Sequence, residues 1–430
     1  MPSASPSRRT RPRPSAAKRS KLVRLTFRVV ALLVPLILLL VVAEVGVRLF
    51  VPPERWKVID ATHHWQIDPA LGWVQQPNLD SYTIDVLTNE AIPLETNGDG
   101  LLPATATPRK PPEAPRVLLV GDSTIVGAGV HERERIHTVL AELLADRGIR
   151  VDVVNAGTQG FATDQSALRL EQLVDRYDPD VVLHCVCAND FVANTLQTNH
   201  GLTKPSFRLD DAGVLVANPF TPSEDIPRMG SGFGGWIQHS AVYRLARPRL
   251  IVLRARLGGW EARNLIGMAS DWYYDAAALE RVDWSLFGAL VQRMDRIASD
   301  HGALFAVYLH PDAGSVWDPV IRETEAGIDP SWDYDRFALE RRATAELERR
   351  GIRFVPLVAY FVQRQERGPF HLLPRDPHCN AEGYRMQAER LAEFLSEEAF
   401  SSPPPTGSDR SAPAIRQAPP EDPSASASGD

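Results

Sequence analysis

From residue 116 onward, short apolar segments alternate with longer segments whose apolar residues recur at helical spacing. The apolar segments are RVLLV (116–120), RVDVVNAG (150–157), DVVLHCV (180–186), ALFAVYL (303–309) and IRFVPL (352–357). Continuous apolar runs of this length are typical of strands buried on both faces. The alternation therefore predicts an α/β fold, in which a parallel sheet is covered on both sides by helices.

The intervening segments have the periodicity and the end signals of helices. Helices are expected near 133–148, 164–177, 281–299, 335–349 and 381–395. Gly148 is expected to end the first of them, Asp164 to cap the second and Asn380 to cap the last. Ligands of such sheets bind beyond the carboxyl ends of the strands, so polar residues at those ends are the candidate site.

Four polar segments follow predicted strands at that edge. They are GDST (121–124), NAGTQG (155–160), AND (188–190) and DPHCN (376–380). Ser123, His378 and Asp376 supply a hydroxyl, a base and a carboxylate to orient the base, which is the set that acyl transfer requires. The backbone N–H groups of Ser123 and Gly160 and the side-chain amide of Asn189 are the expected oxyanion donors. Gly160 lacks a Cβ, so we expect its backbone to approach the substrate closely.

Each segment also has a purely structural interpretation. Ser123 could be a turn residue, Asn189-Asp190 an ordinary turn after a strand, and Asp376 and His378 part of a helix cap. His310 also follows a strand, and we expect it to be a surface histidine rather than part of the pocket. No third or fourth ligand accompanies His63-His64, so a zinc site is not predicted there.

Taken in order, the four segments resemble those of the SGNH (GDSL) hydrolase superfamily, over residues 116–398. The resemblance implies a three-layer α/β/α, flavodoxin-like fold and a serine esterase or acyltransferase that needs no metal and no other cofactor. It implies Ser123 as nucleophile, Gly160 and Asn189 as oxyanion donors, His378 as base and Asp376 as its orienting acid. The G-x-S-x-G motif of α/β-hydrolases is absent, because Ile125 replaces its last glycine.

Two positions depart from the pattern of that superfamily. The acid and histidine are often spaced D-x-x-H, whereas Arg375 occupies the distal position here and Asp376 is one residue closer. The resulting D-x-H spacing is similar to that of the alginate O-acetyltransferase-like branch. Cys187 stands where the third segment commonly has glycine, and its side chain would narrow the pocket.

An uncharged apolar run, VVALLVPLILLLVVA, occupies residues 29–43 and extends to Val47 with Glu44 as its only charge. This length predicts a single transmembrane signal-anchor helix over residues 23–50, with Glu44 and Arg48 paired near its end. The preceding residues 1–22 are basic and expected to form a disordered cytoplasmic tail, which places the catalytic domain on the extracytoplasmic side. A cleaved signal peptide and a buried core helix are the alternatives.

Changes in amino-acid composition predict the remaining domain boundaries. Residues 51–115 are rich in Pro and predict a stalk-like N-terminal extension with sparse structure, and 116–400 predict the hydrolase-like domain. Residues 200–280 interrupt the alternation as an insertion or cap, in which 243–260 could be a cap helix, a helix on the membrane surface or a plain packed helix. Residues 401–430 are Pro- and Ser-rich and expected to be disordered.

Charge and cysteine usage limit the partners. Residues 1–28 hold nine Arg or Lys and no acid, which leaves 38 basic and 54 acidic residues in the rest, a net charge of −16. A domain with this negative charge repels the phosphate backbone of a nucleic acid, so no nucleic-acid partner is expected. Three cysteines make no disulfide framework, although a bond between Cys187 and Cys379 is left open.

The sequence thus predicts a membrane-anchored esterase that cleaves acyl esters, acetyl groups included, through an acyl-serine intermediate. Its expected substrate is a small ester, a lipid or an O-acylated glycan, and its expected partner is the membrane itself. Two alternatives stay open: an O-acyltransferase acting on cell-envelope polysaccharide, and a non-catalytic binding domain of the same fold.

Overall fold

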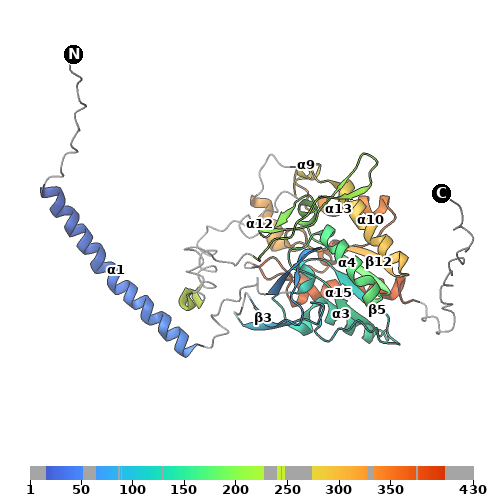
Figure 1. The fold of residues 1–430 in the computed structure, drawn as a ribbon, viewed down its shortest axis with the longest axis horizontal. Coiled ribbons are helices and arrows are strands. Elements are labelled where there is room, and N and C mark those ends of the chain that lie inside the picture. Colours follow the sequence, from blue (N-terminus) through green and yellow to red (C-terminus); the bar gives the residue numbers. More distant parts are fainter. Residues whose placement is uncertain are drawn as a thin grey trace, which may run out of the picture.

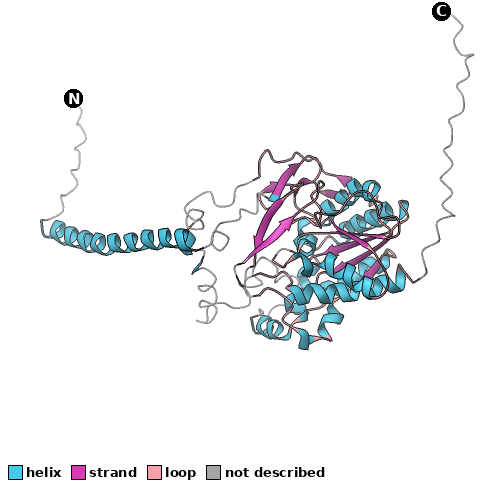
Figure 2. Ribbon diagram, turned by 90° about the horizontal axis from the view of Figure 1, so that it is seen from below, coloured by secondary structure: helices cyan, strands magenta, loops and turns pink. Residues whose placement is uncertain are grey.

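The structure is a computed structural model, shown in Figures 1 and 2. It describes residues 16–51, 64–85, 88, 90–127, 129–226, 240–243, 245–246, 274–327, 333–373 and 376–401. Of the expected tails 1–22 and 401–430, residues 1–15 and 402–430 lie outside the described residues, as does most of the segment 243–260. Residues 16–22 are helical, so the helix expected over 23–50 begins earlier, at Ala16.

A five-stranded parallel sheet forms the centre of the molecule, as the alternating pattern predicts. Its strand order is β13-β12-β7-β5-β6, and each neighbouring pair is parallel. The strands are β5 (Arg116–Val120), β6 (Asp152–Asn155), β7 (Val181–Val186), β12 (Leu304–Leu309) and β13 (Arg353–Val355). All five residues of β5 and all six of β7 are buried.

Helices cover both faces of this sheet (Figure 2). On one face, Val117 and Leu119 of β5 belong to an apolar cluster with α3 (Ile136–Asp146) and α15 (Ala381–Glu398). On the other, Leu118 and Val120 pack with α4 (Thr163–Tyr177), α10 (Trp284–Asp300) and α13 (Ala338–Arg349). Successive side chains of a strand point to opposite faces, so one apolar strand supports both helix layers. The fold is the three-layer α/β/α arrangement that the sequence predicts.

The shorter elements surround this centre. They are α2 (Ser123–Val126), η3 (Glu132–Glu134), α5 (Asp190–Ala193), β8 (Thr198–Asn199), β9 (Leu202–Thr203), β10 (Phe207–Leu209), β11 (Leu215–Ala217), α9 (Ala276–Leu279), α11 (Ala313–Val316), α12 (Asp318–Gly327), α14 (Val358–Val362) and η5 (Gln365–Arg367). Strands β8 and β9 form one antiparallel hairpin, and β10 and β11 form another.

Helix α1 (Ala16–Phe50) extends away from the folded body (Figure 1). Within it, Val30–Phe50 is long and apolar enough to cross a membrane, with a mean hydropathy of 2.8, although a signal sequence has the same properties. Arg48 Nε donates to Glu44 Oε1 at 2.8 Å, the pair expected from the spacing. Glu44 also accepts hydrogen bonds from Ser240 Oγ and from the backbone N–H groups of Ala241 and Val242.

Residues 64–107 differ from the expected stalk with sparse structure. Two antiparallel hairpins form there, β1 (Trp65–Asp68) with β2 (Gly72–Gln75), and β3 (Asp80–Ile84) with β4 (Ala91–Glu95). Trp73 is fully buried and packs with Phe161, while its indole Nε1 donates to the Gln159 carbonyl at 2.9 Å. Isolated aromatics in a Pro-rich segment are here anchors on the hydrolase domain rather than marks of a stalk.

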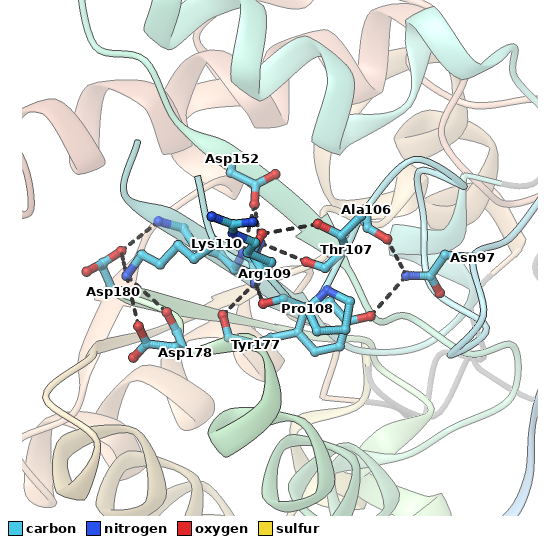
Figure 3. Close-up of polar contacts among 11 residues, drawn as sticks. Asn97, Ala106, Thr107, Pro108, Arg109, Lys110, Asp152, Tyr177, Asp178 and Asp180 are labelled. Atoms are coloured by element: carbon cyan, nitrogen blue, oxygen red, sulfur yellow. Dashed lines mark hydrogen bonds and ion pairs between the residues drawn. The ribbon is translucent and has the colours of Figure 1, made fainter. Parts of the chain in front are cut away.

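The first residue of β5 fastens the end of this extension to the sheet. The Arg116 guanidinium is fully buried and donates to the carbonyls of Thr107, Pro108 and Tyr177, which are labelled in Figure 3. The positive charge of Arg116 is balanced by Asp152 at the start of β6, whose Oδ2 lies 2.6 Å from Arg116 Nη2. A buried guanidinium needs such a full set of acceptors, because an unpaired charge in the interior is strongly destabilising.

Candidate active site

Ser123 lies at the carboxyl end of β5, where the chain turns sharply into α2. Gly121 and Asp122 form the turn, and Asp122 is the helix cap, accepting a hydrogen bond from the backbone N–H of Thr124 at 2.8 Å. The Thr124 hydroxyl donates to the same carboxyl oxygen at 2.6 Å. Ser123 is half-buried between these two buried neighbours. The local sequence thus holds the serine hydroxyl at the accessible rim of an otherwise buried turn.

Asp376 and His378 lie on a loop that precedes α15. The loop is closed by an antiparallel bridge between His371 and Cys379, with Leu372 N donating to the His378 carbonyl at 2.9 Å. Asn380 caps α15 by accepting from Gly383 N at 2.9 Å, as predicted, so Asp376 and His378 are not needed as caps.

These loop residues meet Ser123 across 255 positions of sequence. His378 Nε2 lies 2.8 Å from Ser123 Oγ, and His378 Nδ1 is hydrogen-bonded to Asp376 Oδ1. The backbone N–H of His378 also donates to Asp376 Oδ1, at 2.8 Å. The hydroxyl, imidazole and carboxylate are therefore in the linear order in which a base can take the serine proton while the carboxylate fixes its tautomer.

His378 and Asp376 each stabilise the charged form of the other. Burial lowers the pKa of His378, but its hydrogen bond to Asp376 and the charge of that carboxylate raise the pKa more, so the net shift is upward. Burial likewise raises the pKa of Asp376, and the contacts with His378 outweigh it, so the pKa of Asp376 is lowered. The pair is arranged to stabilise an imidazolium next to a carboxylate, which is the charge state that forms when the serine loses its proton.

Gly160 adopts a left-handed backbone with φ +76° after β6, in a conformation that favours glycine. A Cβ at this position would also lie 2.4 Å from Cδ2 of His200, so the exposed His200 side chain would have to move to accept any other residue. His200 lies in the turn between β8 and β9, where Asn199 Nδ2 donates to the Gly160 carbonyl at 2.8 Å. The ring of Trp65 lies 6.0 Å from that of His200, centroid to centroid.

Asn189 is exposed shortly after the end of β7, and its side chain helps to lower the pKa of the Asp122 carboxyl. An amide has two N–H donors, and the exposure of Asn189 leaves them accessible to a ligand. Burial raises the pKa of Asp122, against the hydrogen bonds that lower it. Asp190, which follows, is buried, and one of its carboxyl oxygens accepts from the Cys187 backbone N–H at 3.2 Å, consistent with a structural role.

Several other expectations need correction. His310 is buried rather than a surface histidine, with 8% of its surface exposed. Asp164 is not the cap of α4, which begins after Ala162; it is buried in the first turn and pairs with Lys204. The three cysteines are free, so the bond left open between Cys187 and Cys379 is absent. His63 lies outside the described residues.

The site also contains residues that sequence reasoning missed. Asp122 is the second residue of the GDST segment, and only the structure shows that its carboxyl group caps the helix that begins at Ser123. His200 sits in a hairpin of the insertion, where nothing in the sequence NHG (199–201) indicates that its ring would reach Gly160. Long-range packing of an insertion is not encoded in a local pattern.

Comparison with known proteins fits this geometry. A model of the GDSL-like lipase/acylhydrolase family matches residues 119–386, more than half of the chain. The chain belongs to this family. The matched range begins within β5 and ends within α15, so it includes Ser123, Gly160, Asn189, Asp376 and His378.

Individual members of the family are distant from this chain. An arylesterase of Vibrio mimicus is 33% identical over 105 residues, which are 24% of this chain and 52% of the relative; the chain thus spans about half of that protein. The solved acetyl xylan esterase AlAXEase is 16% identical, with a TM-score of 0.34, over 65% of this chain and 99% of its own. A Clostridium thermocellum family 3 carbohydrate esterase is 13% identical, with a TM-score of 0.32, over 66% and 95% of the two chains.

Proposed function

We propose that this GDSL-family protein is a serine esterase that cleaves acyl esters through an acyl-Ser123 intermediate. The observation that carries the proposal is the contact of 2.8 Å between Ser123 Oγ and His378 Nε2, with Asp376 on the opposite ring nitrogen. A serine hydroxyl is a weak nucleophile unless an adjacent base takes its proton, and this contact provides that base.

In the first half-reaction, Ser123 Oγ attacks the ester carbonyl carbon and its proton passes to His378 Nε2. The carbonyl oxygen gains the negative charge of a tetrahedral intermediate. When this intermediate collapses, the bond to the alcohol oxygen breaks and His378 returns its proton to that oxygen. The products are a free alcohol and an acyl ester on Ser123, and Asp376 stabilises the imidazolium that exists in between.

The negative charge on the former carbonyl oxygen needs preorganised donors. The Ser123 backbone N–H, the Gly160 backbone N–H and the side-chain amide of Asn189 would supply them. His200, which lies beside Gly160, and Trp65, whose ring lies next to that of His200, would contact the part of the substrate that lies next to this oxygen.

In the second half-reaction, His378 activates a water molecule, which attacks the acyl carbon and releases the acid and Ser123. Transfer to a sugar hydroxyl would use the same steps with that hydroxyl in place of water, and the D-x-H spacing of Asp376 and His378 keeps this alternative open. We propose that the domain is anchored by α1 and acts outside the cytoplasm, on small, lipid or O-acylated glycan esters. The apolar helix and the basic residues that precede it support this arrangement.

The direct test is hydrolysis of a short-chain nitrophenyl ester by the purified full chain in detergent. Ser123→Ala should lower kcat by at least about 10³-fold, because the nucleophile is lost, with an unchanged melting temperature. Ser396→Ala, on the distant helix α15, is the matched control and should keep full activity. Wild-type activity in Ser123→Ala would exclude the proposal. Product release that depends on an added oligosaccharide acceptor would instead identify an acyltransferase.

A further inference from the structure

Three buried side chains at the base of the loop that carries Asp376 and His378 bring metal-ligating atoms together. One ligand atom each from His310, His371 and Cys379 lies within 4.8 Å of the other two. The exposed fractions of these residues are 8%, 2% and 0%. Two imidazoles and a thiol buried at this separation are a donor set suited to a transition metal such as Zn²⁺.

Backbone pairing explains why His371 and Cys379 lie side by side. Leu372 N donates to the His378 carbonyl, and Asn380 N donates to the Phe370 carbonyl. This pattern makes His371 and Cys379 a non-hydrogen-bonded pair, the arrangement in which facing side chains are closest. His378 is the adjacent residue and contacts Ser123, whereas Cys379 lies in the buried cluster with His371.

The third residue comes from the central sheet. His310 follows the last residue of β12, and its Nε2 lies 4.0 Å from Cys379 Sγ. Nitrogen and sulfur ligands of one tetrahedral Zn²⁺ are about 3.5 Å apart, given metal–ligand lengths of about 2.0 and 2.3 Å. To bind one Zn²⁺ together, His310 Nε2 and Cys379 Sγ would therefore have to move closer by only a few tenths of an ångström.

Hydrogen bonding leaves ring nitrogens available for a metal. His371 Nε2 donates to the Pro311 carbonyl at 2.8 Å, which makes Nδ1 the unprotonated nitrogen. That atom is buried and has no hydrogen-bond partner among the described residues. The His310 nitrogen that faces Cys379 Sγ is Nε2, and His310 Nδ1 can carry the ring proton, which leaves Nε2 unprotonated for the metal. A histidine that donates one nitrogen to a backbone carbonyl while the other holds a metal is the usual outer-shell arrangement of metal sites.

We propose that His310, His371 and Cys379 bind a Zn²⁺-class ion that has a structural role. Cys379 would bind as the thiolate, releasing its proton to solvent, and water would fill the fourth position. Gln387 Nε2, 3.2 Å from Cys379 Sγ, would donate a hydrogen bond to that thiolate. The ion would tie both ends of the loop 372–378 to the end of β12, and so hold the segment that carries Asp376 and His378.

The test uses the full chain, purified in detergent through a tag without histidine from cells grown with Co²⁺ in place of Zn²⁺. One equivalent of Co²⁺ should be retained, with visible d–d bands and a near-ultraviolet thiolate-to-cobalt charge-transfer band. Cys379→Ser should lose the charge-transfer band, and His371→Gln should weaken metal binding by at least about tenfold. Cys187→Ser is the matched control and should keep the spectrum, because Cys187 is not in the cluster.

Measurements on the wild-type chain cover the case in which the variants fail to fold. X-ray absorption at the zinc edge of protein grown with Zn²⁺ should show one sulfur at about 2.3 Å and nitrogens at about 2.0 Å. A chain purified without metal that also takes up no Co²⁺ would overturn the proposal. So would a charge-transfer band that survives Cys379→Ser, or a bound metal with no sulfur neighbour. None of these readouts depends on esterase activity, so this proposal and the proposed function can fail separately.

Discussion

Asn189 is exposed shortly after β7, next to the turn that holds Ser123. Its side chain helps to lower the pKa of the buried Asp122 carboxyl, which caps the helix that begins at Ser123. In the proposed mechanism the Asn189 amide is an oxyanion donor, and preorganised donors contribute more to the transition state than to substrate binding.

Asn189→Ala should therefore lower kcat for ester hydrolysis by about 10² to 10³-fold and leave KM nearly unchanged. Steady-state kinetics on the full chain measure both constants. Asn218→Ala, in the β10–β11 hairpin, is the control and should behave as wild type. A rise in KM at constant kcat would show that Asn189 stabilises the bound substrate and the transition state equally, and the assignment of an oxyanion donor would be wrong.

At the scale of single elements, helix α13 has a carboxyl group in an unfavourable place. Glu340 is half-buried in its first turn, and burial raises the pKa of this carboxyl to about 7. Below pH 4.5 it is protonated in both the folded and the unfolded chain. Between pH 4.5 and 7 the unfolded chain loses the proton first, so stability falls as the pH rises through this range.

Glu340→Gln should remove this penalty. At pH 8 the variant should be more stable than the wild type by roughly 1–2 kcal/mol, a value reduced for the partial exposure of the group. At pH 3.5 the two should melt together, because the carboxyl is then protonated in both states. Thermal melts at both values measure the difference, with Glu348→Gln at an exposed position of the same helix as control. Equal melting temperatures of wild type and Glu340→Gln at pH 8 would contradict the burial of this carboxyl.

The elements also show what the sequence could predict. Central strands such as β5 and β7 are continuous apolar runs whose burial is dictated by composition, so their place in a parallel sheet was predictable. The site residues follow those strands, so their meeting at one edge was predictable as well. The hairpins β1–β2 and β3–β4 are short, β4 contains Pro93, and both are stabilised by packing on distant residues; no local pattern indicates them. The burial of His310 depends on the same kind of long-range packing.

On the scale of the whole molecule, a folded hydrolase body is joined to an apolar helix that lies outside it (Figure 1). If α1 is a signal anchor, epitopes placed before residue 1 and after residue 430 should both remain on a chain that resists alkaline carbonate extraction. Protease added to spheroplasts should destroy the C-terminal epitope and spare the N-terminal one. Loss of the N-terminal epitope from a soluble, shortened chain would show a cleaved signal sequence instead.

The central claim is that Ser123, His378 and Asp376 act as one unit, and covalent trapping tests it most directly. A fluorophosphonate reports an activated serine without knowledge of the natural substrate. Mass mapping of the treated full chain should find the label on Ser123, with labelling slowed by at least about 10²-fold in His378→Gln and absent in Ser123→Ala. A label on another serine, or an equal rate in His378→Gln, would contradict the account.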